Sequence, residues 1–405
     1  MDDSLRRNRD FGWLVWGRTC QMTGGAMTSL ALMLYAVDLT GSTRWGAAVM
    51  AASTLGTLVM SLPAGALVDR WDRRRVMVRT SLALAVVLAC VPGAALVGVL
   101  RPIHLVVIAV VIAVLSAFFG PAEQASLPRI VAAQDLGPAA AVNQARGAVA
   151  SLLGPSVAGA LYSLGRSVPL LGDALLNVVS AALVSRVRTP LPPPPQSQDR
   201  PRLLADLRSG LGFIVSTPAV AAIVTMNAIA SFGFGGLLAL ITLTFKAHHL
   251  PDTLIGAMQT ACGISGLAGA LAGPQLLRRC RVSTLFIGGV LINCGCAALM
   301  AVWPQPYLII VLLCLACVAM PPGTAGVQAY QITLTPDHLQ GRVAGANGLL
   351  TLALAPAATM LAGSLTGQPW SLAMSPFLVA IVAIALIAIT HPAIRTLGVN
   401  ANQAT

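Results

Sequence analysis

The sequence predicts an all-α membrane protein with twelve transmembrane helices. Of its 405 residues, 56% are hydrophobic and only 9% are charged, whereas about 25% of the residues of an ordinary soluble domain are charged. Apolar runs of about 20 residues, the length that crosses a bilayer as a helix, recur along almost the whole chain. The basic residues gather in short clusters between these runs. Together these observations exclude a soluble globular protein.

Twelve apolar runs mark the expected spans, and their basic flanks indicate the orientation. Of the 25 basic residues, 20 fall on the side of the N-terminus, four fall on the opposite side, and Arg18 lies inside the first span. An even number of spans and the positive-inside rule predict that both termini are cytoplasmic. The expected spans are 12–37, 45–67, 78–99, 103–122, 145–164, 168–186, 213–245, 253–275, 284–303, 305–327, 344–364 and 372–391.

A proline-rich stretch, TPLPPPPQSQDRPR, interrupts the apolar pattern in the middle of the chain. The following LLADLRSGLGFI carries leucines at helical spacing, which is typical of an amphipathic helix at the membrane surface. We therefore expect a six-helix half over 1–188, a cytoplasmic linker with this helix over 189–212, and a second six-helix half over 213–405.

Matches at a constant offset of 204 residues support an internal duplication of the chain. GALVDRWDRRR at 65–75 aligns with GALAGPQLLRR at 269–279, and Asn143 aligns with Asn347. This offset is close to half the chain, so the two halves are expected to be parallel repeats related by an axis along the membrane normal.

Several function classes are disfavoured by the residue types that the chain holds. Its single lysine, Lys246, does not follow a glycine, so a lysine-containing phosphate-binding loop is absent. The five histidines fall in loops or at span ends, which argues against an intramembrane protease or another enzyme. The Cys314/Cys317 pair lies within an apolar run and is interpreted as packing, so no metal site or cofactor is expected. The basic clusters lack interleaved aromatic residues, and nucleic acid is not an expected partner.

The loop after the second span reads GALVDRWDRRRVMV and combines a glycine, an acidic residue and several arginines. Such a loop could serve merely as a positively charged topology signal. It also resembles the G-x-L-x-D-R-x-G-R-R motif of the major facilitator superfamily, with Asp72 in place of the second glycine. The resemblance extends over nearly the whole chain, to the branch of enterobactin and macrolide exporters. It implies the major facilitator fold and a cytoplasmic gating loop formed by Gly65, Asp69, Arg70, Arg73 and Arg74.

Span five contains LLGPSVAGAL, in which a proline and small residues occur together. Gly154 and Pro155 favour a kink, and Gly159 allows close approach of another helix. This segment resembles the fifth-helix motif of facilitator antiporters, although Ala150 replaces its first glycine, and the resemblance implies export. A plain packing kink remains the alternative.

Ionisable residues inside a membrane span are costly and mark candidate functional positions. Arg18, with Gln21 one turn further, could bind an anionic group or could reach the headgroups. Glu123, at the expected end of span four, could carry a proton or be solvated or paired with arginine. Asp173, with Asn177 one turn on, could carry a proton or line a helix interface. These five residues form the expected substrate and proton pathway.

One departure from the resembling branch bears on proton coupling. Its members often carry an aspartate where this chain has Gly25, and a serine where it has Gln21. Coupling would then have to run through Asp173 or Glu123.

These features predict a secondary transporter of the inner membrane, a proton-coupled exporter of a small amphipathic compound such as a drug, secondary metabolite or siderophore. It would work by alternating access, driven by the proton gradient and without a cofactor. The expected partners are the small-molecule substrate and anionic lipid headgroups on the cytoplasmic side, and the protein is expected to be a monomer. An importer or uncoupled facilitator of a polar solute and a transport-inactive sensor are the alternatives.

Overall fold

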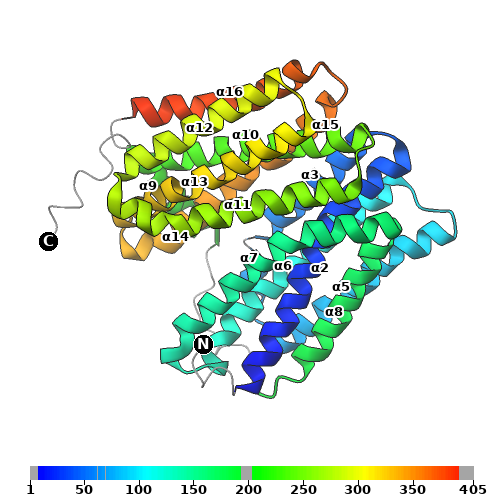
Figure 1. Ribbon diagram of the computed structural model, residues 1–405. Helices are drawn as coiled ribbons and strands as arrows, with labels where there is room; N and C mark the ends of the chain where they lie inside the picture. Colours follow the sequence, from blue (N-terminus) through cyan, green and yellow to red (C-terminus); the bar gives the residue numbers. More distant parts are fainter. Residues whose placement is uncertain (1–7, 62, 69, 193–202, 392–405) are drawn as a thin grey trace. The chain divides into compact units, whose positions relative to one another are not determined.

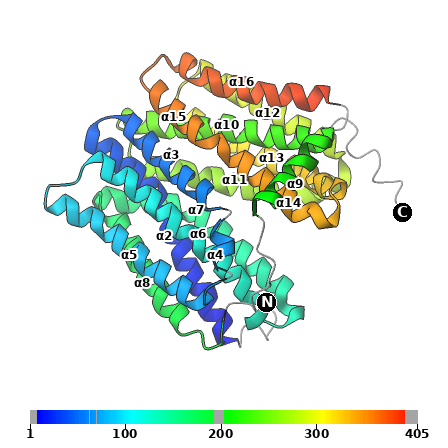
Figure 2. The same cartoon turned by 180° about the vertical axis from the view of Figure 1, so that it is seen from behind.

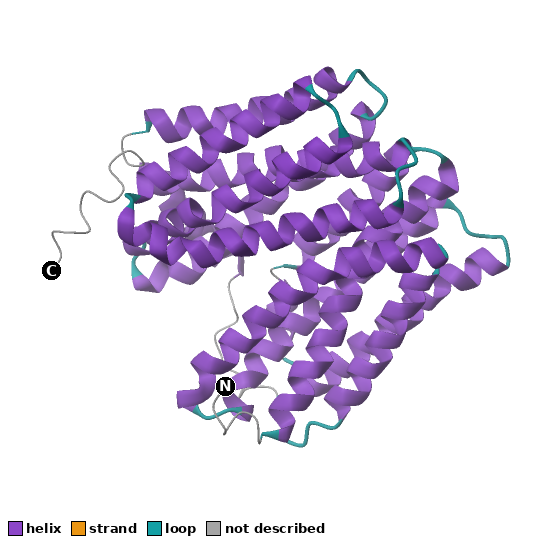
Figure 3. Cartoon of the chain, viewed as in Figure 1, coloured by secondary structure: helices purple, strands orange, loops and turns teal. Residues whose placement is uncertain are grey.

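The computed structural model describes residues 8–61, 63–68, 70–192 and 203–391. Every regular element in these ranges is a helix, and they contain no β-strand (Figure 3). The all-α fold class expected from the sequence is confirmed. The chain divides into two compact units, Met1–Pro201 with Leu250–Thr260 and Arg202–His249 with Ala261–Thr405. Each unit is described by itself below.

The first unit is a helical bundle built around α2. This helix contacts α8, α7, α3 and α6, and Figure 1 shows it between α7 and α8. The reverse view in Figure 2 brings α3 and α4 forward, beside α6. The helices are α2 (Arg9–Thr40), α3 (Thr43–Met60), α4 (Pro63–Val68), α5 (Arg73–Leu96), α6 (Pro102–Ile130), α7 (Leu136–Leu164) and α8 (Val168–Ser185), with a 3₁₀ turn at Ala133–Asp135.

Local capping fixes where the central helices of this unit begin and end. The Asn8 side chain accepts a hydrogen bond from the Phe11 amide at 3.0 Å and starts α2. Gly41, with φ of 66°, ends the same helix in the left-handed conformation that glycine adopts without strain. Asp72 starts α5 by accepting from the Arg75 amide at 2.8 Å. These caps fix where the side chains of α2 and α5 lie along their helices.

The second unit is a bundle around α10, which contacts α16, α15, α14, α9 and α13. Helix α12 packs against α13 and α16. The helices are α9 (Leu203–Ser216), α10 (Pro218–Ala247), α11 (Asp252–Arg279), α12 (Val282–Val302), α13 (Pro306–Leu334), α14 (Gln340–Ala353), α15 (Ala355–Leu365) and α16 (Trp370–Thr390), with a 3₁₀ turn at Asp337–Leu339. The first residues of α11, up to Thr260, group with the first unit.

Eleven helices of the described ranges are long and apolar enough to cross a membrane, if α14 and α15 count as one. The remaining expected span, 45–67, is occupied by α3 and α4. Helix α3 has only 18 residues and includes Arg44, which lowers its mean hydropathy. The span expected at 344–364 is divided at Leu354, because Pro356 near the start of α15 has no N–H to continue the helical ladder. The helix count is broadly consistent with the twelve spans expected.

Large apolar side chains cover much of the outer surface of both units. Val86, Leu271 and Val379 are among those that are exposed. A soluble protein rarely exposes so many contiguous apolar side chains, whereas lipid solvates them without cost. The fold is that of a multi-pass membrane protein.

Candidate functional site

A buried cluster of three charged side chains connects α2, α6 and α7 of the first unit. Glu123 is only 4% exposed. One of its carboxylate oxygens lies 3.2 Å from Arg18 Nε, and the other lies 2.6 Å from Arg146 Nη2. Arg18 also donates to Gln21 Oε1 at 2.6 Å, and Arg146 donates to the Val15 carbonyl at 3.0 Å. The sequence-predicted residues Arg18, Gln21 and Glu123 thus lie together.

This cluster holds two guanidinium groups for one carboxylate and therefore carries an excess of one positive charge. The Arg18 guanidinium lies over the Phe119 ring, 5.3 Å from its centroid, which partly compensates its charge. Arg146 Nε is buried and has no hydrogen-bond partner among the described residues. Because a buried charge without a partner is expensive, Glu123 is the group that makes both arginines tolerable inside the bundle.

The position of Glu123 differs from the sequence-based expectation. We expected it at the end of a span that stopped at residue 122, either solvated or paired with an arginine; the pairing is present, with Arg18 and Arg146, but the solvated position is not. Helix α6 continues to Ile130, so Glu123 lies inside the helix and its side chain is buried. The helix continues beyond the apolar run, and in its last turns Glu123 and Ser126 are buried against protein while Gln124 and Arg129 are exposed.

Arg146 is the functional candidate that the sequence reasoning missed. It was counted with the arginines of a cytoplasmic flank, since span five was expected to begin at residue 145. Helix α7 begins at Leu136, and the Arg146 side chain is only 7% exposed. Its position between Ala145 and Gly147, in a run of small residues, is the signal that could have identified it.

Asp173 lies on α8 and is 2% exposed. Its carboxylate accepts from the Thr28 hydroxyl at 2.6 Å and from Asn177 Nδ2 at 2.7 Å. The carboxylate packs directly against Gly24 of α2, where a side chain on that residue would collide with it. Asp173 and Asn177 therefore form a second polar group, which the absence of a side chain at Gly24 makes possible. The sequence reasoning did not identify Thr28 or Gly24.

A cavity of about 480 Å³ lies between α2, α3, α6 and α7 of the first unit. Arg18, Gln21 and Thr28 line it, together with Ser29, Ser53, Thr54, Thr57, Ser116 and Ser151. The cavity thus reaches the charged cluster through Arg18 and reaches Asp173 through Thr28. Such a polar cavity can hold water or the polar part of a ligand. Water in it could contact both the charged cluster and the Asp173–Asn177 pair.

The described part of the expected gating loop anchors α5 to its neighbours. Arg73 is buried and donates to the Ala125 carbonyl at 2.7 Å, and Arg74 donates to the Ser185 carbonyl at 2.5 Å. Gly65 lies in α4, and Arg70 is exposed. Asp69 lies outside the described residues.

The small residues of span five form a close helix contact. A side chain at Gly154 would collide with Ala26 of α2, and one at Gly159 would collide with the Asp252 carbonyl at the start of α11. Pro155 lies within α7, and its carbonyl leaves no room for a side chain at Gly256. In the same region Ser156 donates to Thr260 Oγ1 at 2.7 Å, and Thr260 donates to the Leu152 carbonyl at 2.6 Å.

The family follows from a match over most of the chain. A family model described as the Major Facilitator Superfamily matches residues 14–360. The chain belongs to this superfamily. The match covers most of both units and confirms the resemblance seen in the loop after the second span. As a member of the superfamily, the protein is a multi-pass membrane transporter.

Several relatives within the superfamily match over most of their length. The multidrug efflux pump Tap of Mycolicibacterium fortuitum is 28% identical over 352 residues, which cover 84% of this chain and 85% of the relative. The macrolide efflux protein A of Streptococcus pyogenes is 26% identical over 359 residues, covering 84% and 86%. The enterobactin exporter EntS of Escherichia coli (strain UTI89 / UPEC) is 24% identical over 343 residues, covering 80% and 78%.

Several solved transporter structures share the fold. A bacterial homologue of the iron transporter ferroportin, in an inward-facing state, superimposes with a TM-score of 0.72 at 18% identity, covering 94% of this chain and 98% of that one. A bacterial homologue of the human lysosomal transporter Spinster gives a TM-score of 0.74 at 14% identity, covering 96% and 98%. At these identities the likeness concerns the fold alone.

Proposed function

We propose that this transporter exports a small amphipathic compound in exchange for protons. The observation that carries the proposal is that the relatives matched over most of their length are named for efflux of drugs and macrolides and for export of enterobactin. A member of the superfamily with such relatives is expected to move a small compound out of the cell. Helix α7 carries a small-residue face like that of the resembling antiporters, and Gly159 on this face packs closely against the start of α11.

The proton route is proposed to pass through Asp173. Among the described residues of the membrane-length helices, Asp173 and Glu123 are the buried carboxylates of the first unit's interior. Both carboxylate oxygens of Glu123 are already engaged by arginines. No cationic side chain among the described residues pairs with Asp173, and Thr28 connects it to the polar cavity. A carboxylate in this setting can take up a proton from one side of the membrane and release it on the other.

The experiment that tests export is accumulation of candidate compounds in everted membrane vesicles, with and without an imposed proton gradient. Gradient-dependent uptake into everted vesicles corresponds to export from the cell and supports the proposal. Uptake that merely equilibrates would indicate an uncoupled facilitator. Gradient-driven movement in the reverse direction would indicate an importer.

The protein is proposed to reside in the inner membrane of a bacterium, as a monomer with both termini in the cytoplasm. The distribution of basic residues supports this orientation, since 20 of 25 lie on one side. The named bacterial relatives support the location.

Anionic lipid headgroups are proposed as partners on the cytoplasmic side. A surface pocket of about 670 Å³ lies at the cytoplasmic end of α5 and α6 by this orientation. Arg70, Arg75 and Arg79 line it, and the stacked rings of Trp71 and Phe118, 6.2 Å apart, form part of its wall. Arginines beside aromatic rings at the membrane surface suit a phosphate headgroup whose acyl chains continue along apolar helices.

Native mass spectrometry of the purified protein with phosphatidylglycerol or phosphatidylcholine tests the lipid proposal. The Arg75→Gln/Arg79→Gln variant should retain at least tenfold less phosphatidylglycerol, whereas the matched Arg278→Gln/Arg279→Gln variant should retain the wild-type amount. Equal loss in both variants would show a general charge effect and would contradict a specific pocket.

A further inference from the structure

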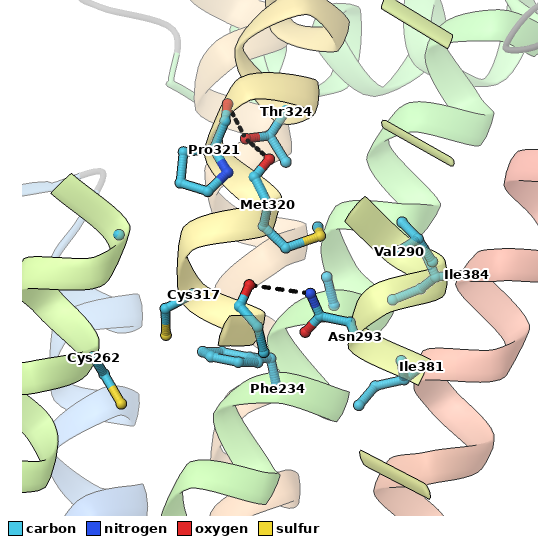
Figure 4. Close-up of a pocket in the computed structure, with 13 residues that line it drawn as sticks. Phe234, Cys262, Val290, Asn293, Cys317, Met320, Pro321, Thr324, Ile381 and Ile384 are labelled. Atoms are coloured by element: carbon cyan, nitrogen blue, oxygen red, sulfur yellow. Dashed lines mark hydrogen bonds between the residues drawn. The ribbon is translucent and has the colours of Figure 1, made fainter. Parts of the chain in front are cut away.

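The second unit contains a cavity that differs in character from the one in the first unit. Its volume is about 370 Å³, at the small end of the range of about 300–1,000 Å³ typical of small-molecule sites. Side chains of α10, α11, α12, α13 and α16 line it, and Figure 4 shows these residues around the open space. Apolar groups make up most of the wall, including Phe234, Val290, Met320, Ile381 and Ile384.

Asn293 of α12 and Thr324 of α13 are the polar side chains of this wall besides two cysteines, and the orientation of Asn293 is fixed. Its Nδ2 donates to the Gly289 carbonyl and to the Ala316 carbonyl of α13, each at 3.2 Å. Reversing the amide would place Oδ1 against two carbonyl oxygens, which repel it. The Asn293 oxygen therefore points away from both carbonyls, toward Phe234 and Ile381 in Figure 4.

The Asn293 oxygen is available to a ligand. No donor of the described residues bonds it, and it belongs to a residue that lines the cavity. Thr324, also in the wall, uses its hydroxyl hydrogen on the Met320 and Pro321 carbonyls at 3.2 and 3.1 Å. The cavity therefore presents a strong acceptor in apolar surroundings.

No carboxylate or basic side chain of the described residues lines this cavity. Moving a charged group into apolar surroundings without a partner of opposite charge is costly. A neutral ligand that can give a hydrogen bond pairs with the Asn293 oxygen, whereas a ligand without a donor leaves that oxygen desolvated and unpaired. The wall thus favours ligands that are uncharged and that carry one hydrogen-bond donor, in addition to ligands of fitting shape.

We propose that this cavity binds an uncharged, largely apolar molecule carrying one hydrogen-bond donor, such as a phenol, alcohol or amide N–H, which the Asn293 oxygen accepts. The inference rests on the proposed export function in one respect, because the cavity would hold the exported compound. Binding itself can be measured without transport.

Two cysteines of the cavity wall supply native reporters of occupancy. Cys262 of α11 and Cys317 of α13 line the cavity and carry free thiols (Figure 4). A bound molecule should shield them from a small membrane-permeant alkylating reagent. Cys90 and Cys280 are exposed elsewhere and serve as internal controls in the same chain.

The experiment uses two probes that differ only in the donor, 1-naphthol and 1-methoxynaphthalene. The purified full-length protein is alkylated with N-ethylmaleimide at increasing probe concentration, and modification of each cysteine is read by mass spectrometry. We expect 1-naphthol to protect Cys317 at a concentration at least tenfold lower than 1-methoxynaphthalene, with Cys90 and Cys280 unaffected. Equal protection by both probes, or no protection of Cys317 at probe saturation, overturns the proposal.

Variants assign the discrimination to the Asn293 oxygen. Asn293→Leu should bring the two probes within about twofold of each other, whereas Thr324→Val, which removes a polar group of the same wall, should preserve the tenfold preference. Should Asn293→Leu fail to fold, Cys317→Phe, which fills the cavity, must abolish protection of Cys262 by 1-naphthol. Probe binding in a protein that exports nothing in everted vesicles would refute the export function and leave the cavity assignment intact. Export without probe binding would refute the cavity assignment.

Discussion

Replacing Asp173 with Asn removes one ionisable group and preserves the packing around it. The asparagine oxygen can still accept from Asn177, and its amide can donate to the Thr28 hydroxyl, which can rotate to accept instead of donating. The two side chains have almost the same volume, so the contact with Gly24 is retained. A change in transport by Asp173→Asn therefore reports on protonation and not on lost packing.

The expected magnitude follows from the energy that a proton gradient supplies. One pH unit corresponds to about 1.4 kcal/mol per proton, so exchange of one proton for one neutral substrate molecule can support about tenfold accumulation. Wild-type protein in everted vesicles should approach tenfold accumulation of the substrate under an imposed gradient of one pH unit. Asp173→Asn should bind substrate and exchange it down its gradient, but its accumulation ratio should fall to about one. Asp173→Glu should preserve some coupling with an altered pH dependence.

Asp38→Asn is the matched control for this experiment. Asp38 is the carboxylate in the last turns of α2, where it accepts from Tyr162 at 2.8 Å and lies 3.7 Å from Arg166. It is half-buried and lies away from the polar cavity, so its variant should accumulate substrate as the wild type does. Accumulation of about tenfold by Asp173→Asn would refute the proton route, and loss of accumulation in both variants would show that the assay reports a general charge effect.

The remaining predictions concern the charged cluster, the gating loop, the orientation and the helix contact. Glu123→Gln should lower the free energy of unfolding by about 3–5 kcal/mol, since it leaves two guanidinium groups inside the bundle without a carboxylate, and a thermal melt at wild-type stability would contradict this. Asp69→Asn should insert normally but transport at least tenfold more slowly, about 1.4 kcal/mol in the balance between inward- and outward-facing states, and a wild-type rate in a well-expressed variant would rule out a gating role for this loop. Single cysteines placed in a cysteine-free background should be labelled from outside the cell at Ser42 and from the cytoplasm at Ser197; the reverse pattern would invert the topology. Gly256→Leu should lower thermal stability markedly, because α7 leaves no room for its side chain, and unchanged stability would show that this contact is not tight.

The fold class could be predicted from the sequence because membrane insertion depends on local properties. The hydropathy of each run and the charge of its flanks are decided within about 20 residues, so the spans could be read without knowledge of their neighbours. The boundaries were less accurate, as at Glu123, because polar residues inside a bundle can extend a helix beyond its apolar run.

The candidate site could be predicted only in part, because its chemistry depends on pairing between helices. Asp173 and Arg18 were identifiable singly, as ionisable residues in apolar runs. Thr28 and Arg146 were not, since a threonine in a span and an arginine near an expected boundary are unremarkable until α8 and α6 are placed beside them. Asn293 was missed for the same reason, because its free oxygen exists only once the α13 carbonyl has oriented its amide.

Among the described residues, charged side chains in the interior of the long helices are distributed unequally between the two units. The first unit buries Arg18, Glu123, Arg146 and Asp173 within its long helices. In the second unit, charged side chains of the membrane-length helices lie near helix ends, as Lys246 does in the last turn of α10. Lys246 is buried, but it does not line the Asn293 cavity, and no carboxylate among the described residues does, so coupling and recognition should be separable by mutation. Substitutions in the Asn293 cavity should change which compounds are exported while leaving the pH dependence of export unchanged, and substitutions around Asp173 should do the reverse. A variant of the Asn293 cavity that altered both properties together would contradict this division.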